Sequence, residues 1–419
     1  MILCTERINR AMCFKTGQKM ATVFLLLSTV ILTVHCTHLS PTIEDYQALT
    51  NRLLANYSSK IRPIWDQSKS LPIQVSMWLA GINDVNDVAQ KMVTTAYLAV
   101  TWTDDMLTWN STETGIYWMH FSQKDLWIPD IVLSNGFTTF KPLGGDFYYL
   151  FVDSDGSVSW YPYMVFESKC ELDVSFYPFD TQTCKIQFKS WSYTQWEINL
   201  TFADDKIGFK EYVENTVWEV TSTDAVNEDS NFEPTIAFII NLRRKSLYYI
   251  MNVFLPIIFL GILSPMVFII PADAGEKMGY AVTIFLTFVV FLTIISSNLP
   301  VNSDSVSYMA MYLVIKLMFG AMIIVITSVQ LRINRRKSER KIGKVYQGLV
   351  RLERRLRCAG QRSGSDLPVT EDKEKAEEAM DEDISWNDVS SAIDFYSFWF
   401  LFIADIAVTS TIFTYTALN

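Results

Sequence analysis

The amino-acid sequence predicts an α+β membrane protein in which an extracellular antiparallel β-sandwich is followed by a four-helix transmembrane bundle. Three observations lead to this fold class. Short runs rich in Val, Ile, Tyr, Phe and Trp occupy residues 71–242 and are separated by turn signals. Four long apolar segments follow them, in a chain of 419 residues that is 50% hydrophobic. An apolar stretch near the N-terminus is typical of a secretory signal peptide, which would place the sandwich outside the cell.

The N-terminal segment, residues 1–36, is expected to be this signal peptide. Basic residues up to Lys19 precede an apolar run at 21–34, and a polar stretch starts at Thr37. Cleavage is expected near Cys36, and Met20 is an alternative initiator.

Cysteines and glycosylation sequons fit the same compartment. Three of the six cysteines belong to the expected signal peptide, and Cys358 follows the third membrane segment, on a side expected to be reducing. Cys170 and Cys184 are therefore the expected extracellular disulfide pair. Three Asn-x-Ser/Thr sequons in the N-terminal half are expected glycosylation sites: Asn56, Asn110 and Asn199.

Residues 37–246 are expected to form the extracellular domain. Apolar residues recur at helical spacing between 41 and 65, which predicts a short amphipathic helix that ends before Pro63. Short strands then alternate with turn signals such as Asn135-Gly136. Asp153 and Asp155 are compatible with a calcium loop, but two carboxylates without further ligands favour a hairpin turn.

Four apolar segments are expected to cross the membrane. The first three, at 247–270, about 276–299 and 306–331, form one block from 247 to 331. A basic cluster from Arg332 onward predicts that the loop 332–391 is cytoplasmic, with a flexible linker and little room for an enzyme domain. Residues 392–419 would hold the fourth helix and a short extracellular C-terminus.

The second membrane segment has two different faces. Residues at steps of three and four form one stripe, which is small or polar at its ends and aliphatic in the middle. This stripe consists of Glu276, Gly279, Thr283, Leu286, Val290, Thr293 and Ser297. One interpretation is a water-filled pore shared by several chains, with Leu286 and Val290 as a hydrophobic constriction and Glu276 as a carboxylate ring that favours cations. The other is tight packing of small residues on neighbouring helices.

Two charged residues are expected deep in the bilayer. Lys316 and Asp405 both lie about ten residues in from the outer ends of their segments, roughly 15 Å deep. An unpaired charge at that depth is costly, so the sequence predicts an ion pair between the third and fourth helices.

Charge and composition exclude several function classes. The net charge of −10 argues against nucleic acid as a partner and favours cationic or neutral partners. The three histidines form no Cys/His or Ser/His constellation. The sequence therefore predicts a protein that is not an enzyme, with no cofactor and no metal site.

One stretch carries a family resemblance. The segment from Cys170 to Cys184 reads CELDVSFYPFDTQTC, and it precedes four membrane segments and a Gly275-Glu276-Lys277 entrance. With these features the chain resembles the Cys-loop pentameric ligand-gated ion channels, in the cation-conducting branch of the nicotinic acetylcholine and type-3 serotonin receptors. The likeness runs from about residue 43 to the C-terminus, without the cytoplasmic loop. Local matches include Trp127-x-Pro129-Asp130 and Trp191-Ser192-Tyr193.

The resemblance implies a pentamer of identical or homologous subunits. It implies a small-molecule agonist, an amine, bound between the extracellular domains, and a pore for monovalent cations. It further implies a multi-pass protein of the plasma membrane in contact with lipid, with both termini extracellular and a postsynaptic location.

The resemblance also implies site residues. For ligand binding these are Trp191, Tyr193, Tyr97, Ser134, Trp160, Phe232 and Glu233. For coupling of the ligand site to the pore they are Asp84, Phe179, Asp180 and Arg244. The aromatic box departs from the nicotinic pattern, since Tyr97 stands where many relatives have Trp and Ser134 where α subunits have Tyr. The alternatives are that these aromatic residues only pack the sandwich, and that Asp180 and Arg244 form a purely structural ion pair.

The sequence thus predicts a subunit of an extracellular ligand-gated cation channel. A first alternative is an orphan or auxiliary channel subunit that needs partner chains for a complete agonist site. A second is a membrane-anchored adhesion or signalling receptor without a pore, which would need neither the polar stripe nor Glu276.

Overall fold

The computed structural model describes residues 40–138, 142–228, 232–272, 275–297, 299, 306–336, 342–361 and 384–418. The expected signal peptide and most of the segment 299–305 lie outside the described residues. The chain forms two compact units. The first contains residues up to Asp66, 103–127 and 149–159, and the second contains 67–102, 128–148 and the chain from Trp160 onward.

The first unit begins with helix α2 (Ile43–Leu54). Its start is fixed by a capping box, in which Thr42 Oγ1 accepts from the Asp45 amide at 3.3 Å and the Asp45 carboxylate accepts from the Thr42 amide at 2.8 Å. The predicted helix is confirmed, and it ends at Leu54, before Pro63 as expected. A short helix α3 (Ser111–Thr114) follows and ends at Gly115, whose φ is 69°.

The first unit also contains an antiparallel hairpin. Strand β5 (Tyr149–Asp153) pairs with β3 (Trp118–Ser122) and with β6 (Ser157–Trp160). Gly156 has a φ of +88° in the turn between β5 and β6, and a Cβ there would lie 2.6 Å from the Asp104 carbonyl oxygen. The turn at Asp153 and Asp155 is therefore a hairpin turn. The described residues contain no group of three or more His, Cys, Asp or Glu that could hold a metal ion.

The second unit contains strands of two sheets. In one, β1 (Leu71–Asn86) pairs antiparallel with β2 (Lys91–Thr103), and β2 pairs with β7 (Tyr163–Lys169). In the other, the order is β10 (Trp218–Asn227), β11 (Thr235–Arg244), β8 (Thr181–Ser190) and β4 (Ile131–Leu133), all antiparallel. Phe188 of β8 lies between Phe166 and Phe238, with ring centroids 5.2 Å and 6.2 Å away, and these rings form the core of the sandwich.

The expectation of a wholly antiparallel sandwich is wrong for one strand. Strand β9 (Ile198–Phe202) pairs with β1 in parallel. The chain leaves β8 in one sheet and crosses to β1 in the other, so β9 can run in the same direction as β1 without a hairpin.

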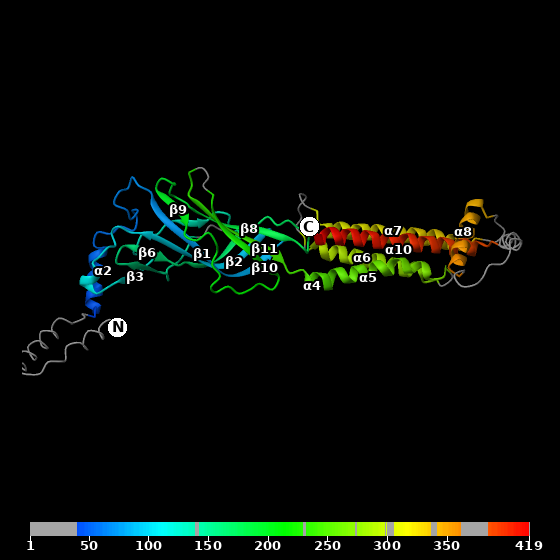
Figure 1. Ribbon diagram of the computed structural model, residues 1–419, viewed down its shortest axis with the longest axis horizontal. Helices are drawn as coiled ribbons and strands as arrows, with labels where there is room; N and C mark the ends of the chain where they lie inside the picture. Colours follow the sequence, from blue (N-terminus) through cyan, green and yellow to red (C-terminus); the bar gives the residue numbers. More distant parts are fainter. Residues whose placement is uncertain are drawn as a thin grey trace, which may run out of the picture. The chain divides into compact units, whose positions relative to one another are not determined.

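Four helices are long and apolar enough to cross a membrane, among the residues that the structure describes. They are Leu247–Ile269, α6 (Lys277–Ser297), α7 (Tyr308–Asn334) and the membrane part of α10 (Trp386–Leu418). Figure 1 shows α5, α6, α7 and α10 side by side, and α6 and α10 both pack on α7. All four predicted segments are thus helical.

The bounds of these helices differ from the predicted ones in informative ways. The first span is irregular: α4 (Leu247–Tyr249), a π-helical turn at Ile250–Phe254, α5 (Leu255–Leu263) and a 3₁₀ turn at Ser264–Ile269. Pro256 and Pro265 lie in its last two parts, where each removes a backbone donor. Helix α10 begins at Trp386, before the apolar run itself.

Helix α8 (Lys344–Gln361) falls in the predicted cytoplasmic loop and was not expected. Its sequence is basic on one face and apolar on the other, and both faces contact α10: Arg354 pairs with Asp388 at 3.5 Å, and the apolar face joins a buried cluster. Val350 lies in a buried cluster with Ile333 of α7 and with Trp386 and Val389 of α10. This cluster explains why α10 extends beyond the apolar run.

Candidate functional site

The polar stripe of α6 lies on a face that packs against none of the other helices that the structure describes. All seven of its residues are exposed, including Leu286 and Val290 at 55% each. The buried side chains of α6 lie on its other side: Lys277, Ala281, Ile284, Phe288 and Ile295. Within one chain, the stripe therefore does not serve the helix packing that was the alternative interpretation.

The hydroxyl groups of this stripe are held by their own helix. Thr283 donates to the Gly279 carbonyl at 2.8 Å, and Thr293 donates to the Val290 carbonyl at 2.7 Å. Each hydroxyl oxygen keeps lone pairs that can accept from water. A hydrated face is therefore possible without any change of rotamer.

The ion pair predicted between the third and fourth helices is confirmed. Lys316 Nζ donates to Asp405 Oδ1, and it also donates to Thr409 Oγ1 at 3.0 Å. The Tyr312 ring lies 4.9 Å from the ammonium. The pair is buried and ties α7 to α10.

A second buried pair was not predicted. Lys277 at the start of α6 donates to Asp394 of α10 at 2.5 Å, and its side chain is fully buried. The sequence placed Lys277 among the charges at the mouth of the second segment. The sequence could have indicated this pair, because Asp394 lies near the inner end of the fourth segment and therefore at the same depth as Lys277.

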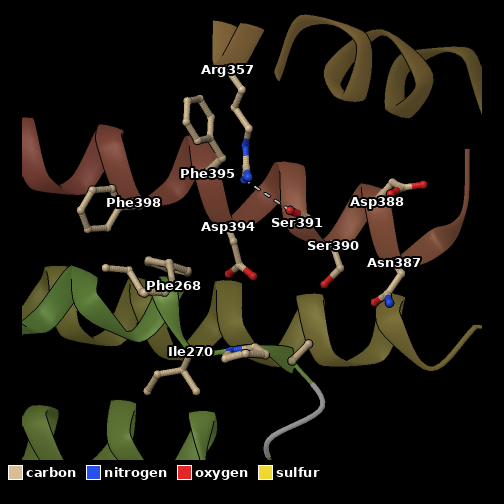
Figure 2. Close-up of a pocket in the computed structure, with 13 residues that line it drawn as sticks. Phe268, Ile270, Arg357, Asn387, Asp388, Ser390, Ser391, Asp394, Phe395 and Phe398 are labelled. Atoms are coloured by element: carbon tan, nitrogen blue, oxygen red, sulfur yellow. Dashed lines mark hydrogen bonds between the residues drawn. The ribbon is translucent and has the colours of Figure 1, made fainter. Parts of the chain in front are cut away.

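A cavity of about 540 Å³ lies beside this second pair (Figure 2). The end of the first span contributes Phe268 and Ile270, and the first turns of α10 contribute several polar residues, including Asp394. Arg357 of α8 reaches toward it, with its guanidinium 3.5 Å from Ser391 Oγ and 5.4 Å from the centre of the Phe395 ring. The cavity joins apolar and charged walls at one end of the helix bundle.

At the other end of the bundle, Arg244 sits in a buried ionic cluster. Its guanidinium donates to both Asp180 oxygens at 2.8 and 3.0 Å and to Asp87 Oδ1 at 2.8 Å. The Trp218 and Tyr177 rings lie 4.2 and 4.9 Å from its central carbon. Burial acts to lower the pKa of Arg244, but the two carboxylates raise it overall.

The second carboxylate partner of this arginine is Asp87, which was not among the predicted coupling residues. Asp84 is exposed, whereas Asp87, at the turn after β1, holds Arg244. Burial raises the pKa of Asp87 although the arginine acts to lower it. Asp84 lies within β1, paired with Val93 of β2, and Asp87 lies in the turn that follows this strand.

The disulfide loop packs directly on the membrane helices. The predicted bridge between Cys170 and Cys184 is confirmed. The Phe179 ring lies 5.9 Å from Phe254 of the first span and 6.1 Å from Phe413 of α10. The Tyr308 amide at the start of α7 donates to the Ser175 carbonyl at 3.0 Å. The loop therefore contacts the first span, α7 and α10.

The predicted ligand-binding residues lie in different environments. Trp191 follows β8 and is 60% exposed, and Phe232 and Glu233 precede β11 and are also exposed. The ammonium of Lys189 lies 5.1 Å from the centre of the Trp191 ring and 2.8 Å from Glu233 Oε2. The structure thus joins Trp191 and Glu233 through a lysine that was not predicted.

The other predicted ligand-binding residues are placed as follows. Tyr97 of β2 stacks on Trp78 with ring centroids 6.0 Å apart, and Ser134 donates to the Gln187 carbonyl at 3.1 Å. Tyr193 is partly buried in the turn after β8. Trp160 is only 1% exposed, which favours the alternative that it packs the core.

Asp130 positions Trp191 and was missed as a site residue. Its carboxylate accepts from Ser190 Oγ at 2.5 Å and from the Ser192 amide at 2.6 Å, and its carbonyl accepts from the Trp191 amide at 3.2 Å. Asp130 belongs to the Trp127-x-Pro129-Asp130 motif, so the sequence could have pointed to it.

The three sequon asparagines Asn56, Asn110 and Asn199 are all exposed, as glycosylation requires.

Family models match most of the chain. One, for the neurotransmitter-gated ion-channel ligand binding domain, matches residues 46–246, and another, for the neurotransmitter-gated ion-channel transmembrane region, matches residues 253–371.

Curated relatives point in the same direction. The chain is 30% identical to the neuronal acetylcholine receptor subunit alpha-6 of Mus musculus over 300 residues, which cover 70% of this chain and 60% of the relative. It is 30% identical to subunit beta-3 of Rattus norvegicus over 327 residues, covering 75% of this chain and 70% of the relative. It is 32% identical to the acetylcholine receptor subunit beta-type lev-1 of Caenorhabditis elegans over 315 residues, covering 73% and 60%. The match spans about three fifths of the length of the first relatives.

Proposed function

Because this chain belongs to the neurotransmitter-gated ion-channel family, we propose that it is one subunit of a pentameric cation channel opened by an extracellular ligand. The family consists of ligand-gated channels and not of enzymes. The observation that carries the proposal is the exposed stripe of α6, which one chain leaves without a packing partner.

Assembly of several copies gives this stripe its role. Around a common axis, the α6 helices would enclose a channel lined by Thr283, Leu286, Val290 and Thr293. The two aliphatic residues would form a narrow apolar ring that excludes water when closed. Glu276, exposed just before the first turn of α6, would form a carboxylate ring that attracts cations and repels anions.

A ligand would act on this pore through the base of the sandwich. Trp191 and Glu233 would contact an amine agonist between subunits, since a tryptophan face attracts a cation. Motion of the sandwich would reach the helices through the disulfide loop, because Phe179 contacts the first span and α10. Arg244, at the end of β11, would keep the loop and this last strand together, because its carboxylate partner Asp180 lies in the disulfide loop just before β8.

The protein would lie in the plasma membrane, at a postsynaptic site. Residues 37–246 and the C-terminus would lie outside and residues 332–391 inside. Partners would be homologous or identical subunits and monovalent cations. Lipid would cover the outward apolar surface of α10, whose most apolar window is only 11% buried in the chain.

The test is whole-cell current from cells that express this chain alone. Leu286→Thr replaces an apolar ring by hydroxyl groups, so it should favour the hydrated pore and give cation-selective current without agonist. Leu292→Thr is the matched control: the same change in the same helix, at a residue that packs on the buried helix cluster. Surface labelling of all three forms accompanies the recordings.

Spontaneous current from Leu286→Thr and none from Leu292→Thr would support the proposed pore face. Equal currents from the two variants, or an anion-selective current, would contradict it. Surface expression without current in any form would contradict a homomeric channel, and co-expression with a related subunit would then test for a heteromeric one.

A further inference from the structure

Lys189 lies where the proposed ligand site would receive a cation. Its ammonium is 5.1 Å from the centre of the Trp191 ring, within the roughly 6 Å range of cation–π attraction. The Glu233 carboxylate lies 2.8 Å from the same ammonium. Both groups that would attract an amine thus already contact a positive charge of this chain.

The local fold holds the lysine in this place. Lys189 is the next-to-last residue of β8, on the strand face that alternates with the buried residues Phe188 and Ser190. Asp130 fixes the backbone of the turn that carries Trp191, through the Ser192 and Trp191 amides. Glu233 approaches from the start of β11, which pairs with β8 through Thr235 and Lys189. The lysine side chain is only 21% exposed, against 52% for the glutamate.

An incoming amine would compete with this lysine. Two ammonium groups cannot share one ring face and one carboxylate without repulsion, because like charges at a few ångströms repel strongly away from bulk water. The lysine is covalently attached, so its local concentration is high at every ligand concentration.

We propose that Lys189 is a tethered cation which occupies the Trp191 face and Glu233, so that an amine binds only by displacing it. This inference rests on the proposed function, in which Trp191 and Glu233 belong to the ligand site. It makes Lys189 the residue that sets the amine affinity of this subunit: removal of its charge frees both the ring and the carboxylate. Amine affinity should then rise by about 3- to 30-fold, the range that one cation–π contact provides.

The chain offers a matched control four residues earlier. Lys185 lies on the same face of the same strand and also pairs with a glutamate, Glu228, at 2.5 Å. Loss of Lys185 removes the same charge and the same kind of ion pair, but not the lysine over Trp191.

The binding experiment uses the full-length chain purified in detergent and equilibrium dialysis with radiolabelled tetramethylammonium. Lys189→Gln should bind this probe about 3- to 30-fold more tightly than the wild type, and Lys185→Gln should bind it like the wild type. Equal affinities of the two variants would overturn the proposal, and so would an absence of binding in Lys189→Gln.

A second measurement tests the contact itself without any ligand. The lysines are reductively methylated with carbon-13, which keeps their charge, and their resonances are recorded. The Lys189 signal should be displaced by the ring current of Trp191 and should return toward the other lysine signals in Trp191→Leu. An unchanged signal would overturn the proposal. Neither measurement needs an open pore. The proposal for Lys189 can therefore fail while the proposed channel function stands, and the channel function can fail while the proposal for Lys189 stands.

Discussion

Gly261 in the first membrane span lies directly against the buried ion pair of the third and fourth helices. A Cβ at this position would lie 2.8 Å from Lys316 Nζ and 2.8 Å from Asp405 Oδ2. Real Cβ atoms essentially never come so close to other heavy atoms. Gly261→Ala must therefore move one charged group or separate the helices.

Two opposing effects set the size of the change. Alanine is favoured over glycine inside a helix by about 1 kcal/mol. Separation of a buried ion pair leaves a charge without its partner, which costs about 3–5 kcal/mol. Because both partners stay in their helices and their side-chain ends can shift, the net destabilisation expected for Gly261→Ala is at most about 4 kcal/mol.

Two other glycines of the membrane helices provide a graded comparison. At Gly320 a Cβ would lie 3.2 Å from Phe285 Cδ2, so the ring must give by a few tenths of an ångström. At Gly279 a Cβ would meet no atom within 4 Å. The predicted order of destabilisation is Gly261→Ala, then Gly320→Ala, with Gly279→Ala unchanged or slightly more stable.

The assay is the thermal unfolding temperature of the chain solubilised in detergent, together with the fraction that reaches the cell surface. Gly261→Ala should lower the unfolding temperature by up to about 5 °C, while Gly279→Ala should not lower it. If the two variants unfold at the same temperature, the ion pair does not constrain the first span.

Three further predictions follow from other charged groups. Asp180→Asn leaves Arg244 buried with one carboxylate fewer and should strongly reduce surface expression. Asp84→Asn, at an exposed position, should leave surface expression unchanged. Equal losses in the two variants would contradict a stabilising role of the ionic cluster around Arg244. Burial raises the pKa of Asp104 from 3.8 to about 6, so the folded form keeps this proton to a higher pH than the unfolded form. The free energy of unfolding should therefore fall by at most about 3 kcal/mol as pH rises from about 4 to about 6. Denaturant unfolding at several pH values should show this fall in the wild type and not in Asp104→Asn, and a fall retained in the variant would refute the assignment to Asp104. Glu276→Gln should shift the reversal potential in dilution experiments toward weaker cation selectivity, and an unchanged potential would count against the carboxylate ring.

The sequence by itself determined the elements whose signal is local. Strand alternation, the lengths of four apolar segments and the three–four spacing of the α6 stripe are periodic properties of consecutive residues, and the structure has them all. The Lys316 and Asp405 pair was also predictable, because the bilayer fixes the depth of each residue along its helix and so restricts the possible partners.

Tertiary structure alone decided which distant residues meet. Asp87 rather than Asp84 holds Arg244 because the turn after β1 directs only one of them inward. Strand β9 runs parallel to β1 because the chain crosses between sheets, and α8 is stabilised by contacts with α7 and α10 that no local pattern reveals. Lys189 reaches the Trp191 ring and Glu233 because β8 and β11 pair in one particular register. Register is set by the packing of the whole sandwich, so the contact of Lys189 with the Trp191 ring could not be obtained from the order of residues.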